Sequence, residues 1–429
     1  MSRLRSSLLN IFSLAAVQGA NALLPLLIYP LVLIRLGPER YGTIVQGEAL
    51  SLMLSALVLY GFEVTGVAAV VRIKEHQREQ LSDLLSAILT TRLLLLILGV
   101  PVIVGVAALM NPDLALPTLA WCLVPLSFAV SPNYMLQALR DNIPLAVINV
   151  VSRAAAVLGV ILTVTGPDRF LFVPLIIGSA YSLAALTALL VTARRYRLSF
   201  SWVGWPRIFD LLKSGRDVFL GNAGAILYRD SYLIILGLVG APSGTIATFS
   251  IAEKLTKAFQ ALVRPLNQHF FPRAMSLAQG TLPQPDKLRA MLRLSAMQQA
   301  ALVGLGLVFL IGYWLFGGML PLGADAEQLN TAIMLFFVMA FATLFGVANY
   351  MLGIAGLNAM GRTRYVLYCQ LGTGIACVLL GFALISQWGA LGAAAMFVTG
   401  EMLLFALFAL GYMRRTLAPT PSARHPERP

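Results

Sequence analysis

One apolar segment of the chain, residues 244–271, carries a face of polar and positively charged side chains. They recur at steps of three and four residues, which is the spacing that places side chains on one side of a helix. On that face lie Ser250, Lys254, Lys257, Ala261, Arg264 and Gln268. Glu253 is placed to pair with Lys257 one turn later. Because ammonium and guanidinium groups bind anions, above all phosphate, this pattern predicts the wall of a wet, cationic cavity.

Several other apolar segments contribute weaker polar stripes of the same kind. These hold Gln18 and Asn21, then Glu48 and Glu63, then Asn149 and Arg153, and finally Asn222, Arg229 and Asp230. An ionisable group inside a bilayer is costly if it faces lipid, so each is expected to face the bundle interior, a partner or water. We therefore predict that the five segments with these stripes surround a shared lumen.

Purely structural roles compete with this interpretation. Arg92 is expected to extend its guanidinium group to the headgroups, and Arg264 fits that role as well as a binding role. The pairs Glu253–Lys257 and Arg229–Asp230 are alternatively ion pairs that only stabilise the bundle. Arg153, Lys254 and Lys257 lie too deep for the headgroups, which favours function. Glu401 is a lone acid in the last apolar segment, and the sequence identifies no partner for it.

The segments that carry these residues are predicted to be transmembrane helices. Of the 429 residues 59% are hydrophobic and only 11% are charged, whereas a soluble chain has about 25% charged residues. The apolar stretches reach the roughly 20 residues that span a bilayer as a helix, and their faces do not alternate as barrel strands do. The first apolar run follows Arg3 and Arg5, is too long for a signal peptide and lacks a cleavage site, so we interpret it as a retained helix.

We predict an all-α protein of about twelve transmembrane helices in two six-helix lobes around a central cavity. The first lobe, residues 1–192, holds helices at about 10–34, 42–70, 83–110, 116–138, 143–165 and 169–192. A cytoplasmic linker, 193–215, precedes the second lobe, 216–412, with helices at 216–240, 244–271, 293–316, 330–355, 364–385 and 389–412. A tail follows at 413–429. A faint repeat, Gly42-Thr43-Ile44 and Gly244-Thr245-Ile246, supports a duplicated architecture.

The distribution of basic residues predicts the orientation. Most of the 31 Lys and Arg residues fall in segments that are cytoplasmic if the N-terminus is cytoplasmic, and the opposite loops hold only Arg35, Arg40 and Arg169. This asymmetry is typical of inner-membrane proteins with positive loops inside. It places both termini in the cytoplasm and explains the net charge of +13 without nucleic acid. The three Cys and three His residues show no metal-ligand or disulfide spacing.

The chain also resembles a known family. Residues 35–42 (Arg-Leu-Gly-Pro-Glu-Arg-Tyr-Gly) are similar to the loop after the first helix of Wzx-type polysaccharide-lipid flippases, in the multidrug/oligosaccharidyl-lipid/polysaccharide exporter superfamily. The resemblance extends to Leu211-Leu212-Lys213, Gly215, Asn222, Leu227-Tyr228, Asp230, Ser250-Ile251-Ala252-Glu253-Lys254 and Phe271-Pro272-Arg273. Ala247 and Phe249 depart from the expected Gly and Tyr, which leaves the exact substrate open.

The resemblance implies a cavity that opens alternately to either side of the membrane and a substrate made of an oligosaccharide on undecaprenyl pyrophosphate. The surface polysaccharide would be O-antigen, capsule or exopolysaccharide. For the pyrophosphate we predict Arg153, Arg229, Lys254, Lys257 and Arg264 as ligands. For the polar lining of the cavity we predict Gln18, Asn21, Asn149, Asn222 and Gln268.

The energy source for transport is predicted from the lack of an ATP-binding motif. The sequence has no Gly-rich phosphate loop followed by Lys-Ser/Thr, which argues against ATP. A proton or sodium gradient is the expected drive, and no other cofactor or metal is expected. The candidate titrating acids are Asp230, Glu253, Glu48 and Glu63.

Two alternatives stay open at this stage. One is an antiporter for small cations or drugs from the same superfamily, against which the number of deep cations argues. The other is a membrane enzyme, a polymerase or ligase for the same lipid-linked glycans, which usually has a large external loop with catalytic Arg or His. The expected partners are the lipid-linked oligosaccharide, membrane lipids, and in the same pathway a polymerase and a chain-length regulator.

Overall fold

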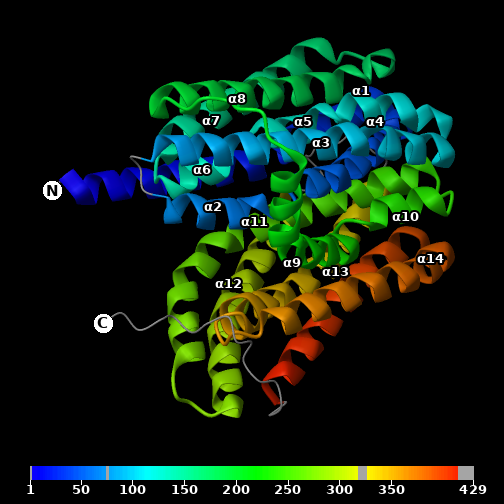
Figure 1. Cartoon of the computed structure of the whole chain (residues 1–429). Coiled ribbons are helices and arrows are strands. Elements are labelled where there is room, and N and C mark those ends of the chain that lie inside the picture. The colour runs from blue at the N-terminus through cyan, green and yellow to red at the C-terminus, as the bar shows by residue number, and fades with distance from the viewer. Residues whose placement is uncertain (1, 74–76, 317–325, 414–429) are drawn as a thin grey trace.

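The computed structural model describes residues 2–73, 77–316 and 326–413, and the side chains at 2–27, 142, 262–265, 316 and 326 lie outside that description. The described part is built from helices without strands. In Figure 1 the helices up to Tyr196, the N-terminal half, lie above those from Trp205 onward, the C-terminal half. The predicted all-α fold is therefore confirmed. The division into two lobes and the predicted tail stay predictions.

The N-terminal half runs from α1 to α8. Its elements are α1 (Ser2–Leu59), α2 (Phe62–Arg72), α3 (Arg78–Met110), η1 (Pro112–Leu114), α4 (Ala115–Trp121), α5 (Leu123–Val130), α6 (Asn133–Ala138), α7 (Asn142–Thr163), η2 (Pro167–Arg169) and α8 (Phe172–Tyr196). Within α1 the backbone turns at Gly37, with φ 72° and ψ 166°. A positive φ is easily adopted only by glycine, so this turn separates the two predicted helices at 10–34 and 42–70.

The C-terminal half runs from α9 to α14. Its elements are α9 (Trp205–Arg229), α10 (Tyr232–Leu238), α11 (Ser243–Gln279), α12 (Gln284–Phe316), α13 (Ala326–Asn349), the π-helix η4 (Tyr350–Leu357) and α14 (Thr363–Met413). Gly389, with φ 51°, turns the backbone inside α14 between the two predicted helices at 364–385 and 389–412. The segment predicted as a linker, 193–215, is largely helical, because α8 extends to Tyr196 and α9 begins at Trp205.

Three predicted helices are not continuous. The helix at 42–70 is interrupted at Tyr60 and Gly61, both with positive φ, and the helix at 216–240 is interrupted at Asp230. The helix at 116–138 is divided into α4, α5 and α6, with Pro132 before α6. Proline has no amide hydrogen, so the carbonyl four residues earlier, that of Phe128, loses its helical donor. Hydropathy alone does not reveal these interruptions, and they become important for the polar contacts below.

Eight stretches of the described residues are long and apolar enough to cross a membrane, which makes the chain a multi-pass membrane protein. Two of them, 28–72 and 363–413, contain the turns at Gly37 and Gly389. The charged helices α9 and α11 are not among these stretches. The number twelve stays a prediction.

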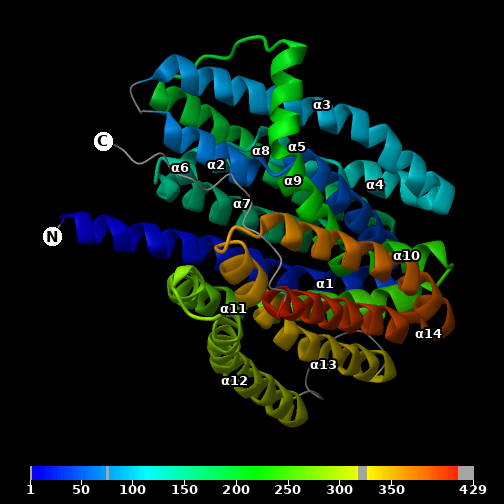
Figure 2. The same cartoon turned by 60° about the horizontal axis from the view of Figure 1, so that its bottom comes forward.

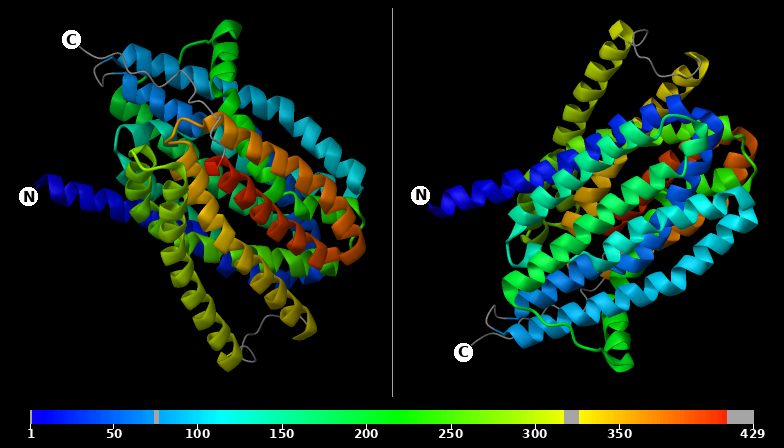
Figure 3. Two further views of the ribbon diagram at one scale, coloured as in Figure 1. Left: turned by 90° about the horizontal axis from the view of Figure 1, so that it is seen from below. Right: turned by 90° about the horizontal axis from the view of Figure 1, so that it is seen from above.

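The two halves meet where α1 packs against α11 and where α9 lies between α3 and α14. A second view shows α1 running through the middle of the molecule (Figure 2). Gly42 of α1 permits close approach, because a β-carbon there would lie 3.0 Å from the carbonyl oxygen of Ser243. The polar residues of α1 and α11 are thereby brought face to face. At the edge of the molecule α12 extends outward from the bundle, and it packs mainly against α11 and α13 (Figure 3).

Candidate functional site

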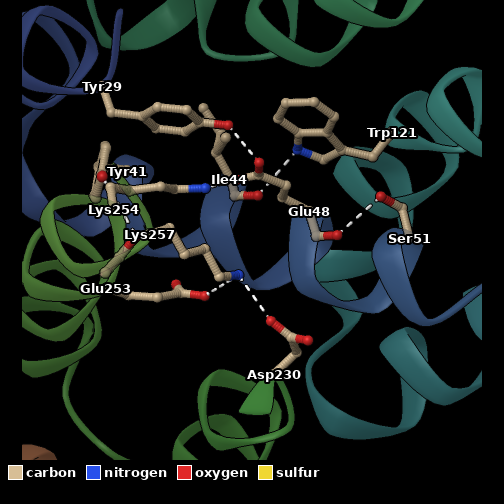
Figure 4. Close-up of polar contacts among 11 residues, drawn as sticks. Tyr29, Tyr41, Ile44, Glu48, Ser51, Trp121, Asp230, Glu253, Lys254 and Lys257 are labelled. Carbon is tan, nitrogen blue, oxygen red and sulfur yellow. Dashed lines mark hydrogen bonds and ion pairs between the residues drawn. The ribbon is translucent and has the colours of Figure 1, made fainter. Parts of the chain in front are cut away.

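An ion pair joins the two halves in the interior of the molecule. The Lys254 ammonium of α11 lies 2.7 Å from Oε2 of Glu48 on α1, and both side chains are largely buried. Tyr29 donates its hydroxyl to Oε1 of the same carboxylate at 2.5 Å, and its ring lies 4.0 Å from the Lys254 ammonium. Figure 4 shows Tyr29 and Lys254 beside Glu48. The carboxylate thus has a partner on each oxygen, which is what a buried charge requires.

A second cation of the same helix stays within the C-terminal half. The Lys257 ammonium bridges two acids, at 2.6 Å from Oε1 of Glu253 and 2.8 Å from Oδ1 of Asp230 (Figure 4). The predicted Glu253–Lys257 pair is confirmed. Asp230 reaches Lys257 because the break between α9 and α10 places it at a helix end. The other oxygen of Glu253, Oε2, is buried and has no hydrogen-bond partner among the described residues.

Arg229 pairs with Glu401, the acid without a partner in the sequence analysis. Its Nε and Nη2 donate to Oε1 of Glu401 at 2.9 and 2.7 Å. The amide of Asn349 donates to Oε2 at 2.7 Å and to the Glu401 carbonyl at 2.9 Å. The alternative Arg229–Asp230 pair is wrong, because α14 packs against α9 and brings Glu401 to the guanidinium group. Asn349 was missed, although an amide inside an apolar helix is a signal for a buried polar partner.

Beside this pair the C-terminal half contains a polar pocket of about 350 Å³. Its walls come from α9, α11, α13 and the start of η4. They include Arg229, Gln260, Asn267, Gln268, Thr343 and Tyr350. Gly346 completes the wall, and a β-carbon there would lie 3.5 Å from Nη2 of Arg229. Since π-helices frequently occur at functional sites, the position of η4 at the edge of this pocket is consistent with a binding role.

The predicted residues of α7, and Asn222 in the last third of α9, do not line this pocket. Arg153 donates from Nη1 to the Tyr181 hydroxyl at 2.6 Å and lies over the Tyr181 ring, within the N-terminal half. Asn149 is half-buried one turn before Arg153, and Asn222 is exposed on α9. The structure therefore brings together Arg229 and Gln268 of the predicted set in one pocket, with Lys254 and Lys257 farther along α11. Arg264, Gln18 and Asn21 fall on side chains outside the described residues.

Arg92 does not reach the headgroups, so that prediction is wrong. Its side chain is fully buried and pairs with Oε1 of Glu63 at 2.8 Å. Nη1 also donates to the carbonyls of Phe128 and Ser131, at 3.3 and 3.0 Å. The first of these carbonyls is the one that Pro132 leaves without a helical donor. Arg92 thus satisfies the break before α6, and this role also occupies Glu63, a predicted coupling acid.

The predicted excess of positive charge is absent from the described part of the cluster. Three cations, Arg229, Lys254 and Lys257, pair with four acids, Glu48, Asp230, Glu253 and Glu401, while Arg153 contacts the Tyr181 hydroxyl. The reason is that helices distant in the sequence bring acids to the cations, and sequence spacing does not reveal such contacts. An anion that enters must therefore compete with carboxylates for these groups. Of the paired three, Arg229 and Lys257 are similarly exposed, at 41% and 40%, and Arg229 is the one that lies in the wall of the pocket.

Comparison with known proteins agrees with this architecture. A family described as "Polysaccharide biosynthesis protein" matches residues 7–277. The chain belongs to this family. A protein of Escherichia coli (strain K12) named "Putative O-antigen transporter" is 23% identical over 93% of this chain and 94% of its own length. A protein of the same name from Shigella dysenteriae is 22% identical over 92% and 97%. The resemblance found in the sequence is confirmed.

Solved structures show the same fold. An inward-facing multidrug resistance MATE family transporter of the MOP superfamily aligns with a TM-score of 0.67 at 16% identity, over 91% of this chain and 94% of that one. The lipid II flippase MurJ, in an inward closed conformation, aligns with a TM-score of 0.65 at 11% identity, over 96% and 88%. The polysaccharide biosynthesis protein described here therefore has a MATE-like fold.

Proposed function

We propose that this chain is a flippase that moves an oligosaccharide linked to undecaprenyl pyrophosphate from the cytoplasmic to the periplasmic leaflet of the bacterial inner membrane. The observation that carries the proposal is the polar pocket inside a membrane-spanning fold, with Arg229 exposed in its wall. Sugars present hydroxyl groups, and the amides of Gln260, Asn267 and Gln268 both donate and accept hydrogen bonds. A guanidinium group holds phosphate oxygens in a bidentate manner.

The ion pairs give this proposal a mechanism. A pyrophosphate that approaches Arg229 replaces Glu401 as a ligand, and Glu401 keeps the Asn349 amide as a partner. Lys254 and Lys257 lie farther along α11 and offer the next contacts once their acids are displaced or protonated. Because Lys254–Glu48 joins the two halves, its opening and closing would accompany alternating access. Arg153 contacts the substrate only in a state that brings α7 toward the lumen.

An ion gradient supplies the energy in this proposal. Three of the candidate acids, Glu48, Asp230 and Glu253, each face a lysine, so protonation or sodium binding would release that lysine for the substrate. The fourth, Glu63, faces the fully buried Arg92. Glu253 is the best placed of the four, because its buried Oε2 lacks a protein partner among the described residues. No further cofactor or metal is part of the proposal. The relatives named for O-antigen support a surface-polysaccharide pathway. A polymerase and a chain-length regulator are the partners that we propose in that pathway.

We propose that the protein is oriented in the membrane with its basic loops and both termini in the cytoplasm. A reporter active only outside the inner membrane is expected to be silent when fused after Arg195 or Met275 and active after Asn111. Activity at Arg195 would reverse the direction of transport proposed here.

The decisive experiment uses purified protein in liposomes and a strain that lacks its own flippase. Wild-type protein is expected to move the undecaprenyl-pyrophosphate-linked oligosaccharide across the bilayer and to restore surface polysaccharide. A well-inserted variant with Arg229, Lys254 and Lys257 all changed to Ala is expected to fail in both assays, with lipid-linked precursor accumulating on the cytoplasmic leaflet. Normal polysaccharide from that variant would refute the mechanism. Loss of polymer with precursor accumulating on the periplasmic leaflet instead would indicate a polymerase or ligase.

A second candidate function is export of small organic cations. It is favoured by the two acids around Lys257, since Asp230 and Glu253 are able to bind a cation once Lys257 moves. The same liposomes distinguish the two functions. Gradient-driven release of a fluorescent organic cation, without movement of the lipid-linked oligosaccharide, would favour the antiporter.

A further inference from the structure

An apolar groove of about 230 Å³ lies on the outer side of the C-terminal half, between α12 and α13. From α12 it is lined by Leu302, Gly306 and Leu310, and from α13 by Phe337, Phe341 and Leu344. Its floor includes the buried ring of Phe259 on α11. The groove contains almost no polar surface, so it suits a hydrocarbon chain.

The groove and the polar pocket share two walls. On α11 the groove ends at Phe259 and the pocket begins at Gln260, the next residue. On α13 the groove ends at Leu344, while the pocket includes Thr343, again a sequence neighbour. The side chains that separate the two cavities are joined by one hydrogen bond, from Nε2 of Gln260 to the Thr343 hydroxyl, at 3.3 Å.

The two cavities also follow one another along the helices. Toward the ends where α11 finishes at Gln279 and α12 begins at Gln284, the walls belong to the pocket, at Asn267, Gln268 and Tyr350. Toward the opposite ends, the walls belong to the groove, at Leu310 and Phe337. A lipid in one leaflet has this same order, with its polar group near one surface and its chain directed toward the bilayer centre.

We infer that this groove binds the first part of the isoprenoid chain of the transported lipid, while the pyrophosphate and sugars occupy the pocket. The inference rests on the proposed function and assigns to the substrate a second contact surface, outside the polar site. The chain passes from pocket to groove between α11 and α13, where the Gln260–Thr343 hydrogen bond is the contact to be opened. The remainder of the chain stays in the bilayer.

Glycines on α12 provide a matched pair of test positions. Gly306 lines the groove, and a β-carbon there would meet only the Phe259 ring, at 4.0 Å. Gly304 lies two residues earlier on the same helix, outside the groove, with open space around its β-carbon position. Gly306→Phe fills the groove, whereas Gly304→Phe adds the same side chain to the same helix and leaves the groove open.

The test compares the undecaprenyl-linked oligosaccharide pyrophosphate in liposomes with a methyl-linked analogue of the same pyrophosphate, which has no isoprenoid chain to enter the groove. For Gly306→Phe we expect transport of the undecaprenyl substrate to fall by about tenfold, the loss that corresponds to roughly two displaced CH₂ groups. Transport of the methyl-linked analogue is expected to change little, and Gly304→Phe is expected to transport both substrates like wild type. Equal transport by the two glycine variants, or an equal loss of transport for the two substrates, would refute the inference that the groove binds the isoprenoid chain.

A measurement on the wild-type protein covers the case in which Gly306→Phe does not fold. An undecaprenyl pyrophosphate with a photoreactive chain is expected to label α12 and α13 along the groove, in competition with unlabelled lipid-linked substrate but not with excess phospholipid. Labelling that phospholipid abolishes would show bulk lipid in the groove and refute the inference. If wild-type protein moves neither substrate, the proposed function itself fails, which is a different result from a groove that is merely not used.

Discussion

Two buried Arg–Glu pairs, one in each half, are arranged in opposite ways. In the N-terminal half the cation is hidden, since Arg92 has an exposed fraction of 0% and Glu63 of 32%. In the C-terminal half the acid is hidden, since Glu401 has an exposed fraction of 0% and Arg229 of 41%. The hidden partner is held by further contacts in each case: Arg92 by the Phe128 and Ser131 carbonyls, Glu401 by Asn349.

Which partner is buried indicates a different role for each pair. The N-terminal pair presents a carboxylate to its surroundings and uses its guanidinium group to satisfy the break before α6. The C-terminal pair presents a guanidinium group to the polar pocket and uses its carboxylate to hold that group in place. Only the second arrangement offers a cation to an anionic substrate. The buried partner therefore positions, and the exposed partner is the one available for binding.

The largest effect on stability is expected for Glu63→Ala. This change leaves the Arg92 charge buried without its counter-ion, and a guanidinium group cannot lose its proton in a protein. We expect a loss of about 3 to 5 kcal/mol in the free energy of unfolding, measured by thermal unfolding in detergent. Adding Arg92→Met to Glu63→Ala is expected to recover only part of it, because Met removes the unpaired charge but leaves the Phe128 and Ser131 carbonyls without their donor. A single variant as stable as wild type would contradict the view of Arg92 as a structural cation.

The next effect concerns transport rather than folding. Arg229→Ala leaves Glu401 buried, but a carboxylate is able to take up a proton and retains the Asn349 amide. Transport is expected to fall about tenfold or more, the value of one charge-assisted contact. Arg229→Lys is expected to recover only part of it, because the bidentate geometry is lost.

The matched control is Asn222→Ala on the same helix, an exposed position outside the pocket, where transport should stay normal. If well-inserted Arg229→Ala protein transports normally, Arg229 does not bind the substrate, and the two pairs do not differ in role as proposed.

An intermediate effect is expected for the pair that joins the halves. Glu48→Gln and Lys254→Gln each remove one partner of a buried contact, so their effects on stability should not add in the double variant. We expect a coupling energy of about 0.5 to 3 kcal/mol from a double-mutant cycle in thermal unfolding. If the stability losses of the two single variants add up in the double variant, the Glu48–Lys254 contact contributes nothing to stability.

The smallest effect on stability is expected for Asp230→Asn or Glu253→Gln alone. Lys257 has two carboxylates, so either variant leaves it one partner. We expect a loss of about 1 kcal/mol or less for each. A coupling role would appear separately, as loss of the response to an imposed proton or sodium gradient with substrate binding retained. If both variants keep gradient-driven transport, coupling lies at another residue.

Much of the fold was accessible from the sequence, because it depends on composition and local spacing. The apolar runs predicted a helical membrane protein, and the segment predicted at 244–271 corresponds to α11, Ser243–Gln279. The Glu253–Lys257 pair was also predicted, since one helical turn fixes its geometry. The interruptions before α6 and at Asp230 were missed, because hydropathy stays high across a break in the backbone.

By itself the sequence determined the class of protein, its family and the helix face of Lys254 and Lys257, all of which follow from residue type and local periodicity. Only the tertiary structure decided the partners. Glu48 lies 206 residues before Lys254, and Glu401 lies 172 residues after Arg229, so no local spacing relates them. Helix packing chose these partners because a buried charge is stable only beside an opposite charge or a hydrogen-bonding group, and packing brings the helices that carry them together.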